Sequence, residues 1–561
     1  MVAAGSIVGL AEELANAQLR NNPFGASYMG VSGYDDAVPD LSPPARQAWR
    51  DRLVDVLVRC ERLEADAHDG DSRVLLAAAR DDATRALAMV DSRVQEFGVT
   101  TLPAGGPSAA LLVAARASIT DAASAAAYLT RCRGFGTYLD QYGARLRTAA
   151  ASGLLPVAPL VDSAISQLRD HLAHPDRDPL LGHRPPEGWD GAAAWREELE
   201  RVVREEIRPA LGRHLELLVE LLPRARPPER AGLLHVPGGV AAYACCIRNG
   251  TTLALDADEV HRLGLAALAE VEERIAELGG RALGARDAAE VLARLREDPS
   301  LQAAAGPDPM AGAAAAIARA EEQMADMFRP PLPPPCTIEA MPPHLAASGT
   351  APMYSPPARD GSRAGAYLFN TVNPGPAGGW GLETAAFHEG VPGHHAQFAR
   401  LQLVPGLPLL LSAIPVLAHG EGWGLYAEQL ADEYGLYSDQ VQRAGMLGCA
   451  AWRAVRLVVD SGLHARGWSR AQALAFALAH TPMPEAFMAA EIDRYIAMPG
   501  QALGYLVGQR EILRLRDHAR ARLGAAFDLR DFHAAVLDHG SLPLPVLSQV
   551  VEAWVTSTAA V

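Results

Sequence analysis

The chain has 561 residues, of which 49% are hydrophobic and 21% are charged, and its formal net charge is -16. These proportions are typical of a folded globular protein and exclude general disorder. Every basic residue is an arginine and none of them forms a dense block, so a nucleic-acid partner is not expected, because phosphate binding needs clustered positive charge. A membrane partner is not expected either, because no stretch approaches about 18 uncharged apolar residues.

The cysteines and the N-terminus predict the compartment. The six cysteines are thinly spread and form no C-x-x-C pair, which argues against a disulfide scaffold or a thiolate zinc site. The first residues, MVAAGSIVGLAEEL, have no basic region, and Glu12 and Glu13 end their apolar run. Such a segment is a poor signal peptide. These features predict a cytoplasmic protein.

Up to residue 328 the sequence is typical of amphipathic helices, with apolar residues at three- and four-residue spacing. Proline and glycine predict the breaks between them. Two helices are expected to join near Gly134, a long helix to break at Pro209, and another to run from Asp256 or Asp258 to Gly279. The expected helical stretches are 45–98, 108–151, 192–222, 256–278 and 311–328.

A change of pattern follows at RPPLPPPC, residues 329–336, where five prolines end the helix and force an extended path. The segment GAYLFNTV, residues 365–372, then alternates like a short strand. After about residue 380 the pattern is helical again to the end. The sequence therefore predicts a mainly α protein, a large helical body with a small β hairpin or sheet inserted at about 337–375.

The most informative segment is FHEGVPGHHAQF, residues 387–398. A His-Glu pair followed by another His is typical of zinc hydrolases, in which two imidazoles bind the metal and the Glu acts on a water molecule. The second ligand usually lies four residues after the first, but here that position is Pro392. On an unbroken helix the histidine seven residues after His388 would lie about 10 Å along the axis. We therefore expect Pro392 and Gly393 to interrupt the helix.

This interruption leaves two candidates for the second metal ligand. We predict His388 as the first ligand, Glu389 as the base and His394 as the second ligand. The alternative is His395, which otherwise lies beside the site as a pocket residue.

A third ligand is expected in HGEGWGLYAEQLADEY, residues 419–434. Glu421 is the candidate, because two His and one Glu with a water in the fourth position form a catalytic zinc set. The competing interpretation is a carboxylate that stabilises a helix N-terminus. Glu428 lies two turns further along the same face and is placed to orient a ligand histidine.

The segments HEGVPGHHAQ, GEGWGLYAEQLADEYG and EIDRYIAMPGQALGYLVGQREILRLR resemble the DUF885 family, which is assigned to the HExxH-type metallopeptidase clan. GEGWGLYAE is also similar to the stretch that supplies the third zinc ligand in gluzincin aminopeptidases. The resemblance implies a helical fold of the neurolysin or Taq carboxypeptidase type with a deep cleft over the metal. It covers about residue 235 to the end, so the chain is divided into a helical region, 1–230, and a metal-binding region, 231–561, within one compact unit.

Further residues are candidates for the rest of the site. Tyr505, with His480 as second choice, is expected to stabilise the oxyanion, although Tyr505 is equally compatible with core packing. Arg494 either binds a substrate carboxylate or pairs with Glu491. The stretch 365–370 resembles an edge strand that aligns a peptide backbone, or forms an ordinary hairpin. Two more residues complete the set of positioning or substrate-binding candidates: Asn370 and Tyr426.

Three functions are compatible with these residues. The first is a peptidase or amidohydrolase that acts on short peptides or small amides with one Zn²⁺ or another divalent ion. The second is a non-haem iron enzyme of small-molecule metabolism, since two His and one carboxylate also describe that site. The third is an inactive binding protein on the same scaffold. Glu389 favours hydrolysis, because an iron oxygenase needs no base beside its first histidine.

Overall fold

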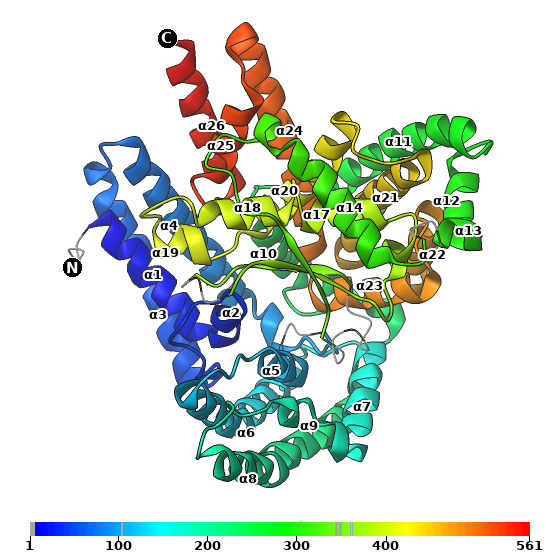
Figure 1. Ribbon diagram of the computed structural model, residues 1–561. Helices are drawn as coiled ribbons and strands as arrows, with labels where there is room; N and C mark the ends of the chain where they lie inside the picture. The colour runs from blue at the N-terminus through cyan, green and yellow to red at the C-terminus, as the bar shows by residue number, and fades with distance from the viewer. Residues whose placement is uncertain are drawn as a thin grey trace.

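The computed structural model describes residues 6–102, 105–303, 306–342, 346, 351–359, 361 and 363–560. Helices make up 72% of the protein, and three short strands form one small sheet across its middle (Figure 1). The prediction of a mainly α protein with a small β element is confirmed. No helix in the described ranges is long and apolar enough to span a membrane.

Most of the helices before the sheet start at a side-chain cap. Asp256, for example, accepts from the backbone of Glu259, whose side chain accepts in return from the Asp256 backbone, a capping box that starts one long helix. These helices are α1 (Ile7–Asn21), α2 (Pro23–Tyr28), α3 (Pro43–Arg62), α4 (Gly70–Ser92), α5 (Gly106–Ala115), α6 (Ala122–Ala151), α7 (Ala158–Ala173), α8 (Ala192–Val202), α9 (Arg208–Leu221), α10 (Gly239–Thr251), α11 (Ala257–Ala282), α12 (Ala288–Glu297), α13 (Pro299–Gln302), α14 (Pro309–Glu322) and α15 (Met324–Met327).

Two predicted helix breaks are wrong. Gly134 lies inside α6, and the join between α5 and α6 falls at 116–121 instead. A Cβ on Gly134 would lie 3.0 Å from the Val38 side chain. Gly279 lies inside α11, where a Cβ would lie 2.0 Å from Cγ2 of Val291. Both glycines permit close packing against distant segments, so they interrupt nothing. The break expected at Pro209 takes the form of a π-helical turn, Val203–Ile207. Pro209 itself lies in the first turn of α9, which starts at Arg208.

Two main apolar cores hold the helices together. Residues of α1, α3 and α4, such as Leu14 and Leu76, share the larger core with the helices from α10 onward. Residues of α5–α9, such as Phe135 and Trp195, build a second core, and these helices occupy the lower part of the molecule in Figure 1. The first helices of the chain therefore pack with its C-terminal half.

The sheet contains β1 (Thr337–Ala340), β2 (Met353–Ser355) and β3 (Ala366–Phe369), in the order β1-β3-β2. All three strands lie within the expected stretch 337–375. β1 pairs parallel with β3, and β2 pairs antiparallel with it. The strand expected at the edge, β3, is therefore the central one. Its alternate side chains serve both faces: Tyr367 and Phe369 enter the larger core, whereas Leu368 packs in a small cluster with Leu112 of α5.

The remaining helices follow the sheet and carry the conspicuous motifs. They are α17 (Leu382–Glu389), α18 (His394–Leu401), α19 (Leu409–Ala413), α20 (Leu417–Glu433), α21 (Gln440–Arg466), α22 (Arg470–His480), α23 (Glu485–Ala497), α24 (Gly504–Leu523), α25 (Leu529–Leu537) and α26 (Leu544–Ala559). Among them α21 is buried along most of its length. The pair α20 and α24 packs closely, because a Cβ on Gly422 would lie only 2.5 Å from the backbone of Gly508.

Candidate metal centre

Three side chains, one each from α17, α18 and α20, converge in space. The Nε2 atoms of His388 and His394 lie 3.5 and 3.6 Å from Oε2 of Glu421. One ligand atom of each residue lies within 4.8 Å of the others. Both histidines are buried, and the Glu421 side chain is 24% exposed. The structure thus brings together the three residues predicted as metal ligands.

The interruption between α17 and α18 makes this convergence possible. α17 ends at Glu389, and α18 starts at His394. A Cβ on Gly393 would lie 2.0 Å from the carbonyl oxygen of His388, so only glycine fits where the chain folds back on itself. The indole of Trp423 donates to the carbonyl oxygen of Pro392 at 3.0 Å, which fixes this turn against α20.

Each histidine of the cluster is oriented by a partner on its other ring nitrogen. Nδ1 of His388 donates to Oε1 of Glu428 at 2.7 Å, as predicted from the spacing on α20. Nδ1 of His394 donates to Oε1 of Gln397 at 3.1 Å. Both Nε2 atoms are thereby left to face Glu421. Outer partners of this kind fix the tautomer and ring orientation of metal-binding histidines. Gln397, one turn after His394, was not recognised in the sequence.

The helix that carries Glu421 lies unusually close to His388. A Cβ on Gly424 would lie 2.5 Å from Cε1 and 2.8 Å from Nε2 of that imidazole. The glycine of the GEGWG stretch therefore makes room for the ring. Without this approach, Glu421 and Glu428 could not both reach the two nitrogens of one histidine from the same helix.

The electrostatics of the cluster suit a cation. Burial raises the pKa of Glu389, and within the described residues its hydrogen-bond partner is a backbone N–H and not a cationic side chain. Burial opposes the charge of His388, but its bonds to Glu421 and Glu428 outweigh burial and raise the pKa to about 10. Burial also opposes the charge of Glu421, but the two histidines hold its pKa well below the usual range. The carboxylates of Glu389, Glu421 and Glu428 make the cluster negative. The two Nε2 atoms and the Glu421 oxygen are ligand atoms that suit a divalent ion.

The predicted base is held by the sheet. The backbone N–H of Tyr354 in β2 donates to Oε2 of Glu389 at 2.6 Å. β2 is an edge strand of the sheet, and this hydrogen bond shows that its free edge faces Glu389. The strand next to the site is therefore β2, and the expectation that 365–370 forms the edge is wrong, because β3 is covered by a neighbour on each side.

The alternative ligand, His395, is bound elsewhere. Its Nε2 donates to the carbonyl oxygen of Pro334 at 2.7 Å, and its Nδ1 accepts from the hydroxyl of Tyr354 at 3.1 Å. Burial lowers the pKa of His395. Both ring nitrogens are thus used to hold the segment before β1 and the strand β2, and His394 faces Glu421 instead.

The two candidates for an oxyanion donor lie in different places. Burial and the charge of Glu421 raise the pKa of Tyr505, which indicates that this tyrosine lies near the cluster. Nδ1 of His480 lies 2.7 Å from Oε1 of Glu272 on α11, and its ring packs on Phe476. No contact found for His480 in the described part of the chain reaches the cluster.

The remaining candidates are held in structural contacts. The Tyr426 hydroxyl donates to Nε2 of His533 at 2.8 Å. Oδ1 of Asn370 accepts from the backbone of Val372 and Asn373 after β3. Arg494 pairs with Glu491 at 2.8 Å, which is the structural alternative considered for that arginine.

Residues of the N-terminal half also lie near the site. Tyr28, at the end of α2, has its pKa raised by burial and by the charges of Glu389 and Glu421. Arg116 lies over the Tyr28 ring at 4.8 Å and donates to the hydroxyl of Ser355 in β2 at 3.1 Å. A tyrosine and an arginine within generic helical sequence carry no motif, so only the fold shows their position.

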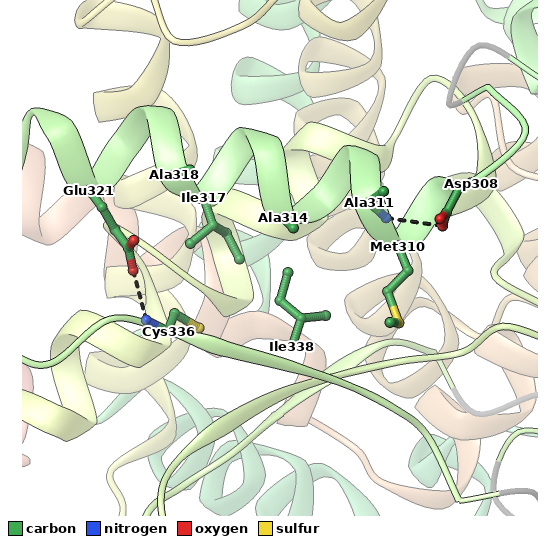
Figure 2. A pocket seen from close by; sticks show the side chains of 9 residues that line it. All are labelled: Asp308, Met310, Ala311, Ala314, Ile317, Ala318, Glu321, Cys336 and Ile338. Atoms are coloured by element: carbon green, nitrogen blue, oxygen red, sulfur yellow. Dashed lines mark hydrogen bonds between the residues drawn. The ribbon is translucent and has the colours of Figure 1, made fainter.

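A cavity of about 310 Å³ lies between α14 and the start of β1 (Figure 2). Apolar side chains such as Met310 and Ile338 line most of it, and the backbone N–H of Cys336 donates to Glu321 at 2.7 Å at one end. The wall formed by Ile317 also touches the turn after α17, since a Cβ on Gly390 would lie 2.5 Å from it. The predicted metal ligands do not line this cavity.

Comparisons with other proteins give the family of this chain and solved structures of similar fold. The protein belongs to the family described as bacterial proteins of unknown function (DUF885), which it matches over residues 23–551. No curated protein matches the chain. A structure described as the "putative lipoprotein" of Colwellia psychrerythraea is similar with a TM-score of 0.90 and 26% identity, over 98% of this chain and 99% of that one. A "putative lipoprotein of unknown function" from Shewanella oneidensis has a TM-score of 0.72 and 16% identity, over 97% and 99%.

These descriptions contradict the predicted cytoplasmic location, which is therefore wrong. A lipoprotein is anchored to a membrane by attached lipid, and two proteins of closely similar architecture carry that description. The prediction failed because it was drawn from scattered cysteines and from the first residues. A helical fold stabilised by large apolar cores needs no disulfides in any compartment.

Proposed function

We propose that this protein is a zinc-dependent metallohydrolase that acts on short peptides or small amides, as a member of the HExxH-type metallopeptidase clan with a neurolysin-like cleft over the metal. One observation supports the proposal above all. Nε2 of His388, Nε2 of His394 and Oε2 of Glu421 converge one residue from the half-buried Glu389, which directly follows His388. His388, His394 and Glu421 would hold the ion.

The roles of the other residues follow from their contacts. A zinc ion bound by this set supplies a Lewis acid that polarises the substrate carbonyl and acidifies water. Glu389, steadied by the Tyr354 backbone N–H, accepts a proton from the attacking water and delivers it to the leaving amine. Glu428 keeps His388 in the tautomer that leaves Nε2 available. Tyr505 is the candidate donor to the oxyanion.

Hydrolysis is favoured over oxidative chemistry by the position of Glu389. A non-haem iron enzyme needs two histidines and one carboxylate, with no buried base next to the first histidine. Desolvation raises the pKa of the half-buried Glu389, as expected of a carboxylate that serves as a general base near neutral pH. An inactive scaffold gives no reason to keep this arrangement.

The proposal is tested with two conservative variants assayed together. Glu389→Gln keeps the shape of the side chain and removes its basicity, so we expect a folded protein with normal metal content and a loss of about 10²–10⁴ in hydrolysis rate. Glu421→Gln weakens a ligand, so we expect lower metal content as well as a lower rate. The measurements are metal analysis and turnover of peptides found in a screen of short peptides and amides. Near wild-type turnover by metal-loaded Glu389→Gln would contradict the proposal.

A further inference from the structure

One buried arginine, Arg453, has no hydrogen-bond or ion-pair partner among the described residues. It lies in α21 and is only 9% exposed. Its Nε is enclosed without a partner. The guanidinium carbon lies 3.9 Å from the ring centroid of Trp452 and 5.1 Å from that of Tyr505. Buried charges are normally paired, because desolvation of an ion is costly.

The neighbouring arginines show what a structural arginine looks like in this fold. Arg456 donates to Glu491 at 3.0 Å and to the Tyr495 hydroxyl at 3.1 Å. Arg494 pairs with the same carboxylate at 2.8 Å. Arg456 and Arg494 therefore share one acid, Glu491, and Arg453 has no such pair among the described residues. Even Arg456 keeps one enclosed nitrogen, Nη1, without a hydrogen-bond partner among the described residues, so this arginine can also donate to a further acceptor.

Electrostatic interactions connect Arg453 with the candidate metal centre. Burial and the positive charge of Arg456 lower its pKa, whereas the nearby charge of Glu428 raises it, and Glu428 is bonded to His388. The Tyr505 ring lies against the guanidinium of Arg453 and also responds to the charge of Glu421. Tyr505 thus connects the arginine to the cluster, and as a partly exposed residue it lies where the site meets solvent.

We infer that Arg453, with the free edge of Arg456, binds a carboxylate of the substrate beside the metal centre. This inference rests on the proposed function and narrows its substrate to amides with a free carboxylate beyond the scissile bond, such as a peptide with a free C-terminus or an N-acyl amino acid. The planar guanidinium fork matches a carboxylate in two parallel hydrogen bonds. In the reaction, water adds to the amide carbon, the C–N bond breaks, and the proton that Glu389 carries goes to the nitrogen of the released amino acid.

The test measures binding separately from turnover. The protein carries Glu389→Gln to prevent hydrolysis, and the probes are mixtures of N-acetyl dipeptides, each as free acid and as C-terminal amide. Equilibrium dialysis followed by mass spectrometry gives both affinities. We expect the acids to bind at least 10-fold more tightly than the amides. Adding Arg453→Gln should weaken the binding of the acids about 10–100-fold, the range for a hydrogen bond to a charged group, and leave the binding of the amides unchanged. Arg453→Lys should keep part of the affinity for the acids.

Arg443→Gln is the matched control, because Arg443 lies on the same helix and is paired with Asp432 at 2.6 Å. It should keep the preference for acids, and circular dichroism should show that every variant is folded. Equal binding of acids and amides would overturn the inference. A preference abolished by Arg116→Gln but kept in Arg453→Gln would also overturn it, since the carboxylate would then bind near β2. Selective binding of acids without turnover by the wild-type protein would support the inference and contradict the proposed function.

Discussion

The close approach of α20 to His388 leads to a prediction on two glycines of one helix. A Cβ on Gly424 would lie 2.5 Å from Cε1 of His388, whereas a Cβ on Gly420 would meet nothing within 4 Å. Carbon atoms in contact are about 3.5–4.0 Å apart, so Gly424→Ala must displace the imidazole or the helix by about 1 Å. Zinc–nitrogen distances are confined to about 2.0–2.1 Å, so a ligand moved by about 1 Å no longer fits the ion. At a reactive site a misplacement of about 1 Å lowers the reaction rate about 10²-fold.

The two alanine variants should therefore change the free energy of unfolding in opposite directions. Gly420→Ala gains about 0.5–1 kcal/mol of stability, because glycine is unfavourable inside a helix. Gly424→Ala loses about 1–3 kcal/mol through overpacking and binds metal about 100-fold more weakly. Urea denaturation gives the free energies of unfolding, and competition with a chelator gives the metal affinities. If both variants kept wild-type metal affinity, the packing of α20 on His388 would not be what positions that ligand.

Three further outcomes are expected. Glu428→Gln removes the charge that orients His388 and should weaken metal binding about 10–100-fold in a chelator competition; unchanged affinity would refute its role. Burial lowers the pKa of His533 to about 3, so between pH 6.5 and 3 this histidine binds a proton in the unfolded chain but not in the folded protein. The free energy of unfolding therefore decreases as the pH falls through this range. Urea denaturation from pH 7 to 4 should show the wild-type protein losing up to about 1.4 kcal/mol per pH unit more than His533→Gln, and parallel losses would refute this. Arg456→Met breaks the buried pair with Glu491 and should cost about 3 kcal/mol, measured the same way, whereas a neutral effect would contradict that pairing.

Helical periodicity predicted the fold class, because an amphipathic helix shows its buried face in a few consecutive turns. The failures concern contacts between distant segments. Gly134 and Gly279 look like breaks in isolation, but they pack against Val38 and Val291, which no local pattern connects to them. The central position of β3 likewise depends on β1 and β2, which lie outside any window around it.

The candidate site shows the same division. His388, His394 and Glu421 were found because metal binding requires particular residue types at restricted spacings. Even the helix interruption was visible as a proline and a glycine. Arg116 and Arg453 were not found, since a single arginine in a helical pattern looks like a solvated charge until the fold shows it to be near the site.

The central claim is that His388, His394 and Glu421 bind one divalent ion. The most direct measurement is the metal content of protein purified without a metal-affinity tag, incubated with zinc and dialysed, for the wild-type chain and for His394→Ala. We expect about one zinc ion per wild-type chain and very little in the variant, with both proteins folded. Wild-type protein without bound metal, or equal zinc in both proteins, would contradict the account.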